Sequence, residues 1–158
     1  MNKLTHIDKN GLPAMVGVSE KLPTKRTAKA RSIVVLPDDV RQHFLGTDIQ
    51  SAKGSVFQTA ILAGIMGAKK TGDLIPLCHP LGLEDCKVEL QLNEEGELVI
   101  ECTASITAKT GVEMEALVGA SIAALTVYDM CKAMSHEIVI RETKLLSKTG
   151  GKHDYKST

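Results

Sequence analysis

The chain has 158 residues, of which 19 are Lys or Arg and 19 are Asp or Glu, so its formal net charge is zero. That length favours a single domain, and a composition of 43% hydrophobic and 24% charged residues is typical of a globular protein. Zero net charge argues against general nucleic-acid binding, which usually needs a basic surface. Two Tyr, two Phe and no Trp also leave few rings on which bases could stack.

No targeting or membrane segment is expected. The N-terminus is polar and lacks the apolar run of a secretory signal, and no uninterrupted apolar stretch approaches the ~18 residues of a transmembrane helix. The four cysteines contain no Cys-x-x-Cys pair, and no further ligands cluster beside the adjacent Cys78 and His79. We therefore expect reduced, mostly buried thiols, no metal site and a cytoplasmic location.

In chain order, the first half predicts an arm, a strand and two helices. Residues 1–30 are polar with scattered Gly and Pro, which predicts an extended arm. A β-branched run at 32–36 predicts a strand, and the residues from Pro37 predict a short helix through about residue 45. Apolar residues at helical spacing predict a helix over 56–70. The segment 73–83, which carries two prolines, is expected to form a loop.

The second half predicts a hairpin, a long helix and a last strand. Period-two alternation indicates strands over 86–92 and 98–108, joined by a turn. The longest helical pattern covers 113–134, and the last strand is expected over 138–146. This order is that of the split β-α-β-β-α-β, ferredoxin-like α+β fold, an antiparallel sheet with both helices on one face. We expect one domain over 31–150, a tail over 151–158, and an oligomer that covers the free sheet face.

The clearest candidates for chemistry lie near the end of the long helix. Asp129 and Lys132 continue the stripe of Val118, Ile122 and Leu125, and an apolar stripe that ends in charges needs partners for them. Two interpretations stay open. The pair is an i,i+3 ion pair worth about 0.2–0.5 kcal/mol, or the carboxylate sets the position and ionisation of the lysine for acid–base chemistry.

Lys53 precedes the helix expected from residue 56. A lysine is electrostatically unfavourable beside the positive end of a helix dipole. The run Lys53-Gly54-Ser55 therefore fits an anion site built from free amides, a glycine and a cation. A solvated lysine before an ordinary serine cap explains the same residues.

Other residues suit contacts with a ligand, and each has a plainer explanation. Two prolines stiffen the segment 76–80, which either holds His79 for a ligand or is a loop without function. The carboxylates at 113–115 cap the long helix or hold donor groups of a heterocycle. Arg26 and Lys148 are cations suited to phosphates, or solvated charges.

Several blocks of the chain are similar to those of one known family. The blocks are Lys53-Gly54, Leu74-Ile-Pro-Leu-Cys-His-Pro80, Thr110-Gly-Val-Glu-Met-Glu-Ala-Leu117, Ala123-Ala-Leu-Thr-Val-Tyr-Asp-Met-Cys-Lys132 and Lys148-Thr-Gly-Gly-Lys152. Over nearly its whole length the chain resembles the molybdenum cofactor biosynthesis protein C family, the cyclic pyranopterin monophosphate synthases. The resemblance implies a ferredoxin-like fold assembled as a hexamer of three dimers, with active sites at dimer interfaces.

The resemblance also implies a reaction and roles for residues. Family members convert 3',8-cyclo-7,8-dihydro-GTP to cyclic pyranopterin monophosphate and release pyrophosphate, as phosphorus–oxygen lyases. Asp129 is then the catalytic acid, and Lys53 and Lys132 serve acid–base steps and stabilise phosphates. We expect one of two neighbouring lysines to have a lowered pKa. The substrate-contacting residues implied are Leu77, Cys78, His79, Glu113, Met114, Glu115, Arg26 and Lys148. No cofactor is expected, and a divalent ion bound with the substrate phosphates is left open.

Two other functions suit the same topology, because a fold alone does not determine function. A catalytically silent nucleotide-binding or regulatory module could keep the surface cations, but it has no reason to keep Asp129 on an apolar stripe. An RNA-recognition module needs strand aromatics and a basic excess, which this chain lacks. The enzyme is therefore the leading hypothesis.

Overall fold

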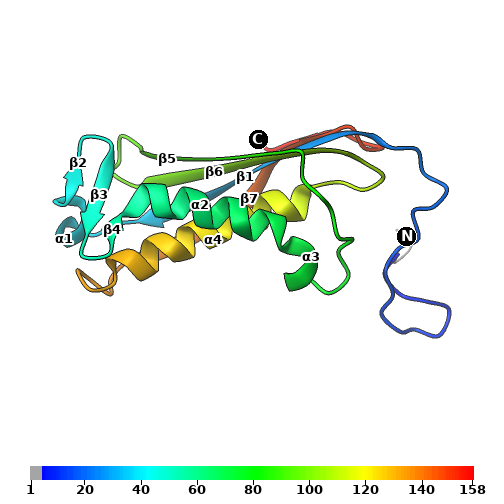
Figure 1. Cartoon of the computed structure of the whole chain (residues 1–158), viewed down its shortest axis with the longest axis horizontal. Coiled ribbons are helices and arrows are strands. Elements are labelled where there is room, and N and C mark those ends of the chain that lie inside the picture. Colours follow the sequence, from blue (N-terminus) through cyan, green and yellow to red (C-terminus); the bar gives the residue numbers. More distant parts are fainter. Residues whose placement is uncertain (1–4) are drawn as a thin grey trace.

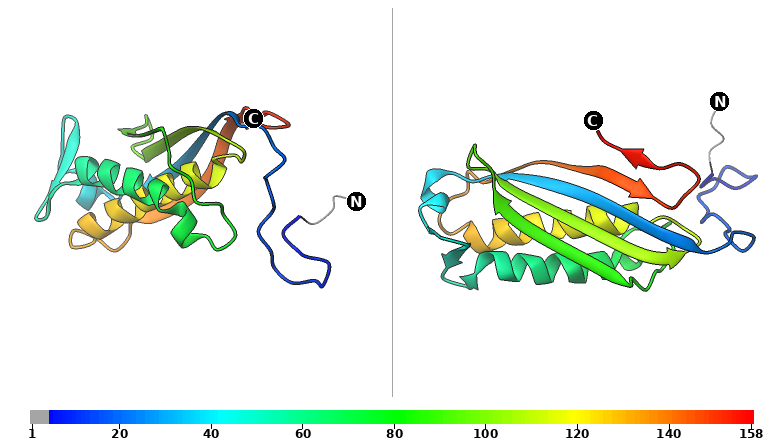
Figure 2. Two further views of the ribbon diagram at one scale, coloured as in Figure 1. Left: turned by 45° about the vertical axis from the view of Figure 1, so that its right-hand side comes forward. Right: turned by 90° about the horizontal axis from the view of Figure 1, so that it is seen from above.

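A computed structural model describes residues 5–158 and has one main antiparallel sheet. Its strands are β1 (Thr24–Val35), β5 (Asp85–Leu92), β6 (Leu98–Ala108), β7 (Val139–Thr149) and the short β8 (Tyr155–Lys156), in the order β5-β6-β1-β7-β8. Two long helices, α2 (Val56–Lys69) and α4 (Glu113–Cys131), cover one face of this sheet (Figures 1 and 2). The first four of these strands and the two helices have the ferredoxin-like order, which confirms the predicted α+β fold class.

Smaller elements lie at the two ends of the sheet. At one end are α1 (Asp38–Arg41) and a small sheet of β2 (Phe44–Leu45), β3 (Asp48–Ser51) and β4 (Gly54–Ser55), which leads into α2 (Figure 1). At the other end lie α3 (Thr71–Leu74) and the N-terminal arm (Figure 1). These two ends are where the candidate functional residues are found.

Alternation along the central strands separates the core from the open face of the sheet. In β1 the inward residues Ala28, Ala30 and Val34 are at most 1% exposed. Their neighbours in β6 alternate in the same way, and Ala30 pairs with the fully buried Cys102. One side of each central strand therefore faces the helices.

Small residues bring the two helices close to each other and to the sheet. A Cβ atom added at Gly64 of α2 would lie 2.9 Å from the backbone oxygen of Gly119 in α4. A Cβ atom added at Gly119 would lie 2.5 Å from Sγ of Cys102, beneath the helix. Both glycines are therefore needed for close approach. The buried face of α4 is likewise made of small side chains, among them Ala116, Ala120, Ala123 and Ala124.

The predicted apolar stripe of α4 lies on its outer side. Along that stripe exposure rises from Val118, which is 9% exposed, to Leu125, which is 55% exposed. The small residues on the opposite side occupy the core instead, because they allow the closest packing on the sheet. The stripe that carries Asp129 therefore borders a surface that this single chain leaves partly uncovered.

Several element boundaries differ from those expected. β1 begins at Thr24 instead of residue 32, because small and polar residues alternate there without the β-branched run that signals a strand. The short helix ends at Arg41 and a strand takes Phe44–Leu45. The expected loop begins only after α3, and α4 ends at Cys131 instead of residue 134. β7 extends to Thr149, so the last predicted strand is longer than its apolar part.

One described helix, α4, has the length and apolar composition of a membrane span. However, 56% of its apolar window is buried inside the protein. The helix also packs against α2 and the main sheet. This burial is that of the core helix of a folded domain.

Candidate active site

Lys53 lies at the tip of a tight hairpin that leads into α2. Ser51 of β3 pairs with Gly54 of β4, which leaves Ala52 and Lys53 as the turn. The Ser51 hydroxyl accepts the Lys53 backbone N–H at 3.1 Å and donates to the Gly54 carbonyl at 3.1 Å. Gly54 has φ of 106°, which side chains disfavour. Lys53 is therefore presented by a rigid turn, two residues before the N-cap of α2.

Asp129 lies between the two predicted catalytic lysines. One carboxylate oxygen, Oδ2, is 2.8 Å from Nζ of Lys53, and the other, Oδ1, is 2.8 Å from Nζ of Lys132. All three side chains are about half exposed. Residues from a hairpin turn and from the C-terminal end of α4, far apart in the sequence, thus form one cluster, which we call the lysine cluster.

The lysine cluster has a defined charge state. Hydrogen bonds from Lys132 and then Lys53 lower the pKa of Asp129 to about 2. The hydrogen bond to Asp129 and its charge raise the pKa of Lys132, which is opposite to the lowered lysine pKa expected from like-charge repulsion. The carboxylate between the ammonium groups outweighs their mutual repulsion. In the free chain Asp129 is therefore an anion held between two lysine side chains.

The predicted substrate-contacting residues gather at the opposite end of α4. A cavity of about 340 Å³ is lined there by Arg26, Leu77, Cys78, His79, Glu113, Met114 and Glu115. The same cavity is lined by Lys109 and Thr110, which were not among the predicted site residues. We call this group the cavity cluster. Thr110 belongs to a block quoted for the family resemblance, whereas no signal in the sequence distinguishes Lys109 from the other lysines.

Lys148 joins the cavity cluster through an ion pair. Its Nζ lies 2.8 Å from Oε1 of Glu113, the first residue of α4. Burial by itself would raise the pKa of Glu113, but the hydrogen bond from Lys148 and the charges of Lys148 and Arg26 lower it overall. Glu115 is only 4% exposed, and its burial and the charge of Glu113 raise its pKa. Two neighbouring carboxyls are thus shifted in opposite directions.

The Glu113–Lys148 pair predicts a pH-dependent contribution to stability. Because the Glu113 pKa is lower in the folded state, its contribution is present above the unfolded-state pKa of about 4.3 and is lost as the pH falls through the folded value. Glu113→Gln is expected to destabilise the protein by about 0.5–1 kcal/mol at pH 7. Urea unfolding should show that difference at pH 7 and a smaller one at pH 3.5. An equal difference at both values would contradict an ionic contribution.

Two buried polar atoms in the cavity have no partner. Within residues 5–158, Nε of Arg26 and the hydroxyl of Thr110 are buried and make no hydrogen bond. Buried polar groups are normally paired, and both residues line the cavity. These atoms are therefore the ones that a polar ligand would satisfy.

Thr110→Val is expected to weaken substrate binding without harming the fold. Its hydroxyl has no partner in the free chain, so its loss should leave the melting temperature unchanged or slightly raised. The KM should rise by about two- to tenfold, the effect of one neutral hydrogen bond, at nearly constant kcat. Thr107→Val, on the exposed side of β6, is the matched control. An unchanged KM in Thr110→Val would mean that the hydroxyl does not touch the substrate.

The N-terminal arm forms part of the lining of the cavity. Nε2 of His79 lies 2.8 Å from the Val16 carbonyl oxygen and, since a carbonyl only accepts, is the donor. Nζ of Lys109 donates to the Ser19 carbonyl at 3.1 Å. Arm residues Val16 and Val18 also line the cavity. In the free chain the arm thus holds the side chain of His79, which was predicted to contact the substrate.

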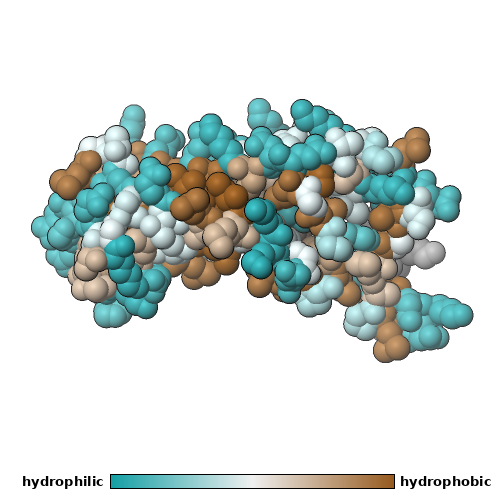
Figure 3. Space-filling view, in the orientation of Figure 1, coloured by the Kyte–Doolittle hydropathy of each residue, from teal (hydrophilic) through white to brown (hydrophobic). Residues whose placement is uncertain are grey.

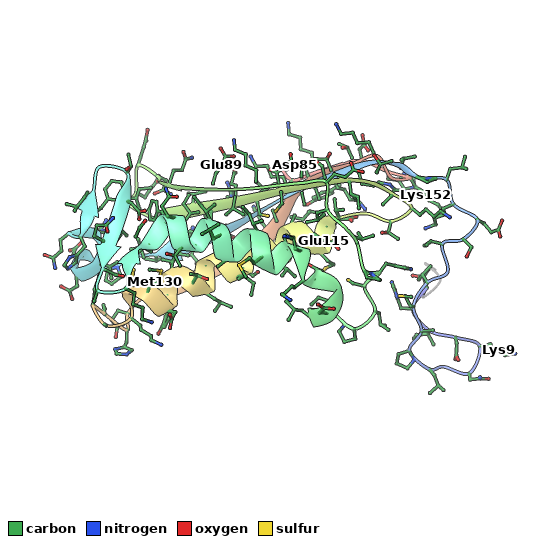
Figure 4. The ribbon with its side chains drawn as sticks, in the orientation of Figure 1. Lys9, Asp85, Glu89, Glu115, Met130 and Lys152 are labelled. Atoms are coloured by element: carbon green, nitrogen blue, oxygen red, sulfur yellow. The ribbon has the colours of Figure 1, made fainter. Side chains whose placement is uncertain are left out.

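The lysine cluster and the cavity cluster lie far apart within one chain. Glu113 and Asp129 are 16 residues apart on one helix, a separation of about 24 Å at ~1.5 Å per residue. Figure 4 shows this spacing: Glu115 is labelled at one end of α4 and Met130, next to Asp129, at the other. The predicted site residues therefore form two groups, and one chain does not bring them to a single small ligand.

No group of three or more His, Cys, Asp or Glu side chains in the described part of the chain is placed to hold a metal ion. The polar groups available to a ligand are instead ammonium, guanidinium, imidazole, hydroxyl and carboxylate groups. Clustered cations of this kind suit phosphate oxygens, and the carboxylates of the cavity suit N–H donors of a heterocycle.

Comparisons with known proteins agree with this chemistry. The family described as the MoaC family matches residues 15–151. The chain is 52% identical to a cyclic pyranopterin monophosphate synthase from Xanthomonas campestris pv. campestris, covering 96% of this chain and 92% of that protein. It is 48% and 49% identical to proteins named molybdenum cofactor biosynthesis protein 1 from Dictyostelium discoideum and Drosophila melanogaster, of which it spans 27%. With this match over most of its length, the chain belongs to the MoaC family.

Proposed function

We propose that this protein is a phosphorus–oxygen lyase of molybdenum cofactor biosynthesis. Its reaction converts 3',8-cyclo-7,8-dihydro-GTP to cyclic pyranopterin monophosphate and pyrophosphate. The observation that carries the proposal is the Asp129 carboxylate with a lysine ammonium 2.8 Å from each oxygen. The name of the Xanthomonas relative supports the same activity.

The lysine cluster has the groups that this reaction needs. Closing a cyclic phosphate forms one P–O bond and breaks the P–O bond to pyrophosphate, while the attacking hydroxyl loses a proton. Preorganised cations stabilise the charge that develops on the phosphates, and Lys53 and Lys132 are two such cations. Proton transfers in the rearrangement of the purine ring need a donor and an acceptor. We propose that the lysines transfer the protons and that Asp129 sets their position and ionisation, because a carboxylate whose pKa is lowered to about 2 is a weak base.

The cavity cluster is proposed to hold the other parts of the substrate. Arg26 and Lys148 suit phosphate oxygens as cations, and Glu115 suits the N–H groups of the heterocycle as a buried carboxyl. His79 can exchange its bond to the arm for one to the substrate. In this proposal Arg26 and Lys148 supply the positive charge that the substrate phosphates need. Turnover in the presence of EDTA tests whether a divalent ion accompanies the substrate phosphates.

We further propose that each complete site is formed by two copies of the chain. An antiparallel arrangement about a two-fold axis places the lysine cluster of one copy beside the cavity cluster of the other. The helical face between the two clusters exposes Leu62, Met66 and Leu125 by 64%, 58% and 55%. Figure 3 shows hydrophobic side chains near the middle of that face. A patch of this kind fits a self-complementary interface.

The open face of the sheet supports assembly beyond a dimer, as a hexamer of three dimers. Asp85 and Glu89 of β5 lie on the side away from the helices (Figure 4). Arg31 of β1 pairs in register with Lys144 of β7 nearer the other edge. Lys87 lies between the two acidic residues on the same side of β5, so the face carries charges of both signs. Such charges can complement those of further copies. Sedimentation should give about six times the 16.9 kDa chain mass.

We propose a cytoplasmic location because the cysteines are free thiols. All four are free, including Cys86 and Cys102, whose sulfur atoms are 3.9 Å apart. Unpaired thiols at that separation fit a reducing compartment.

The proposed function is tested with purified protein and 3',8-cyclo-7,8-dihydro-GTP. Pyrophosphate release and pterin formation are expected from the unaltered chain and should be lost in Lys53→Ala. An assembled protein that binds the substrate without releasing pyrophosphate would instead support the silent nucleotide-binding module.

A further inference from the structure

One buried carboxylate has no place in the reaction described so far. Asp48, the first residue of β3, is 9% exposed and forms no ion pair within the described residues. Its Oδ1 accepts the backbone N–H of Ile49 at 2.6 Å and of Phe57 at 2.7 Å. Its Oδ2 accepts the backbone N–H of Gln58 at 3.4 Å and the hydroxyl of Ser55.

These bonds make Asp48 a distant cap of helix α2. Phe57 and Gln58 are in the first turn of α2, where backbone N–H groups lack partners within the helix. Ser55, at the N-cap position, makes no side-chain cap bond to the helix, and its hydroxyl is used by Asp48 instead. Burial raises the pKa of Asp48, but the bonds from Ser55, Phe57, Ile49 and Gln58 lower it overall. The carboxylate is therefore ionised and fully used within the protein.

The same bonds close the base of the hairpin that presents Lys53. Asp48 begins β3 and Ser55 ends β4, so the bond between their side chains joins the two strands below the turn. The turn itself is held by Ser51, and its tip carries Lys53. Asp48 therefore joins the base of this hairpin to the first turn of α2.

Asp48 also lies near the other half of the lysine cluster. Its charge helps burial to raise the pKa of Cys131 to about 11. Cys131 is the last residue of α4 and lies between Asp129 and Lys132 in the chain. Asp48 is thus placed where the hairpin, the start of α2 and the end of α4 meet.

We infer that Asp48 is a positioning residue, which holds Lys53 at the Asp129 carboxylate by fixing the hairpin against the first turn of α2. The inference rests on the proposed function for its kinetic consequence. It does not make Asp48 a catalytic residue, because its oxygens are occupied by groups of its own chain. The consequence is that the geometry of the lysine cluster depends on a side chain outside it.

Asp48→Asn is the variant that tests this role with the least damage. The amide oxygen can still accept from Ile49 and Phe57, while the amide nitrogen repels the Gln58 N–H and can meet the Ser55 hydroxyl only as a donor. The link to the hairpin is thus weakened and the main contacts to the helix remain. We expect kcat to fall about 10- to 100-fold, the effect of a small displacement of a reacting group, with little change in KM. Asp38→Asn, an exposed aspartate paired with Arg41, is the control.

A double-mutant cycle separates positioning from general damage. If Asp48 acts through Lys53, adding Asp48→Asn to Lys53→Ala should lower no further the residual single-turnover rate, which is measured with enzyme in excess of substrate over long reaction times. Equal losses in both backgrounds would overturn the inference, because they would show an effect independent of Lys53. Thermal unfolding of each variant checks that the protein is folded.

A second measurement does not depend on turnover. Acylation of lysines by an amine-reactive ester, followed by peptide mass spectrometry, reports how freely the Lys53 amine leaves its ion pair. Asp48→Asn should raise the Lys53 rate about two- to fivefold, as for loss of an exposed ion pair, with Lys87 as the reference lysine. An unchanged Lys53 rate would overturn the inference. If the unaltered protein shows no turnover, the proposed function fails while acylation still decides the role of Asp48.

Discussion

Lys132→Ala is expected to lower turnover about 10²- to 10⁴-fold, the range for loss of a group that transfers protons. The lysine contributes both a positive charge and a proton, and its pKa is raised because Asp129 holds it as an ammonium group 2.8 Å away. Removing it leaves Asp129 with Lys53 alone, so the carboxylate moves and the phosphates lose a cation. Pyrophosphate release and pterin formation under saturating substrate measure the loss.

The fold should survive this substitution. Lys132 is the C-cap residue of α4, and its side chain is about half exposed, so its removal creates no cavity. Lys9→Ala is the control, since Lys9 is an exposed lysine of the N-terminal arm and belongs to neither cluster. Sedimentation of both variants should match that of the unaltered protein. Turnover of Lys132→Ala within a few fold of the unaltered enzyme would refute a lysine-centred reaction.

Mixing two inactive variants is expected to restore activity if each site is shared between chains. Lys53→Ala disables the lysine cluster and Arg26→Ala disables the cavity cluster. In a mixed dimer one site combines both defects and the other combines two intact clusters. Half of the dimers are mixed at equal proportions, so about one quarter of the full activity should return. Co-expression of the two chains with one shared tag, followed by purification of all assemblies together and assay, measures this recovery.

The control for complementation uses two variants of the same cluster. Lys53→Ala mixed with Lys132→Ala leaves every site with one defective lysine cluster, so no activity should return. Recovery in this control would show that the two lysines do not act in one site. No recovery in either mixture, from correctly assembled protein, would mean that one chain supplies both clusters to a site. The ~24 Å between the ends of α4 makes that arrangement difficult for a nucleotide-sized ligand.

Predictions from periodicity were most reliable for elements whose apolar residues recur at a regular spacing. The strand over 98–108 has the observed bounds, and the helix expected over 56–70 ends one residue earlier. The start of β1 was missed because alanine and polar residues alternate there without a β-branched signal. Periodicity did not show which side of α4 is buried, because a helix with small residues on one side and larger ones on the other is apolar on both.

The candidate residues were recognised largely from sequence motifs. Those motifs did not show which of the residues lie together in space. Nothing in the spacing of Lys53 and Asp129 shows that a hairpin turn meets the end of a helix 76 residues later. The expected lowering of a lysine pKa was wrong for Lys132. The hydrogen bond to Asp129 and the negative charge of that residue raise the pKa of Lys132. Asp48 was not noticed at all, since its partners are backbone N–H groups that any residue has.

The sequence alone predicted the order of strands and helices, the fold class and the family of the chain. These predictions succeed because periodicity and short motifs are local properties. Folding in three dimensions decided the rest. It separated the candidate residues into two clusters at the ends of α4, lowered the pKa of Asp129 by placing two ammonium groups against it, and left an apolar face exposed between the clusters. These features depend on distances between segments remote in the chain, which no local pattern records.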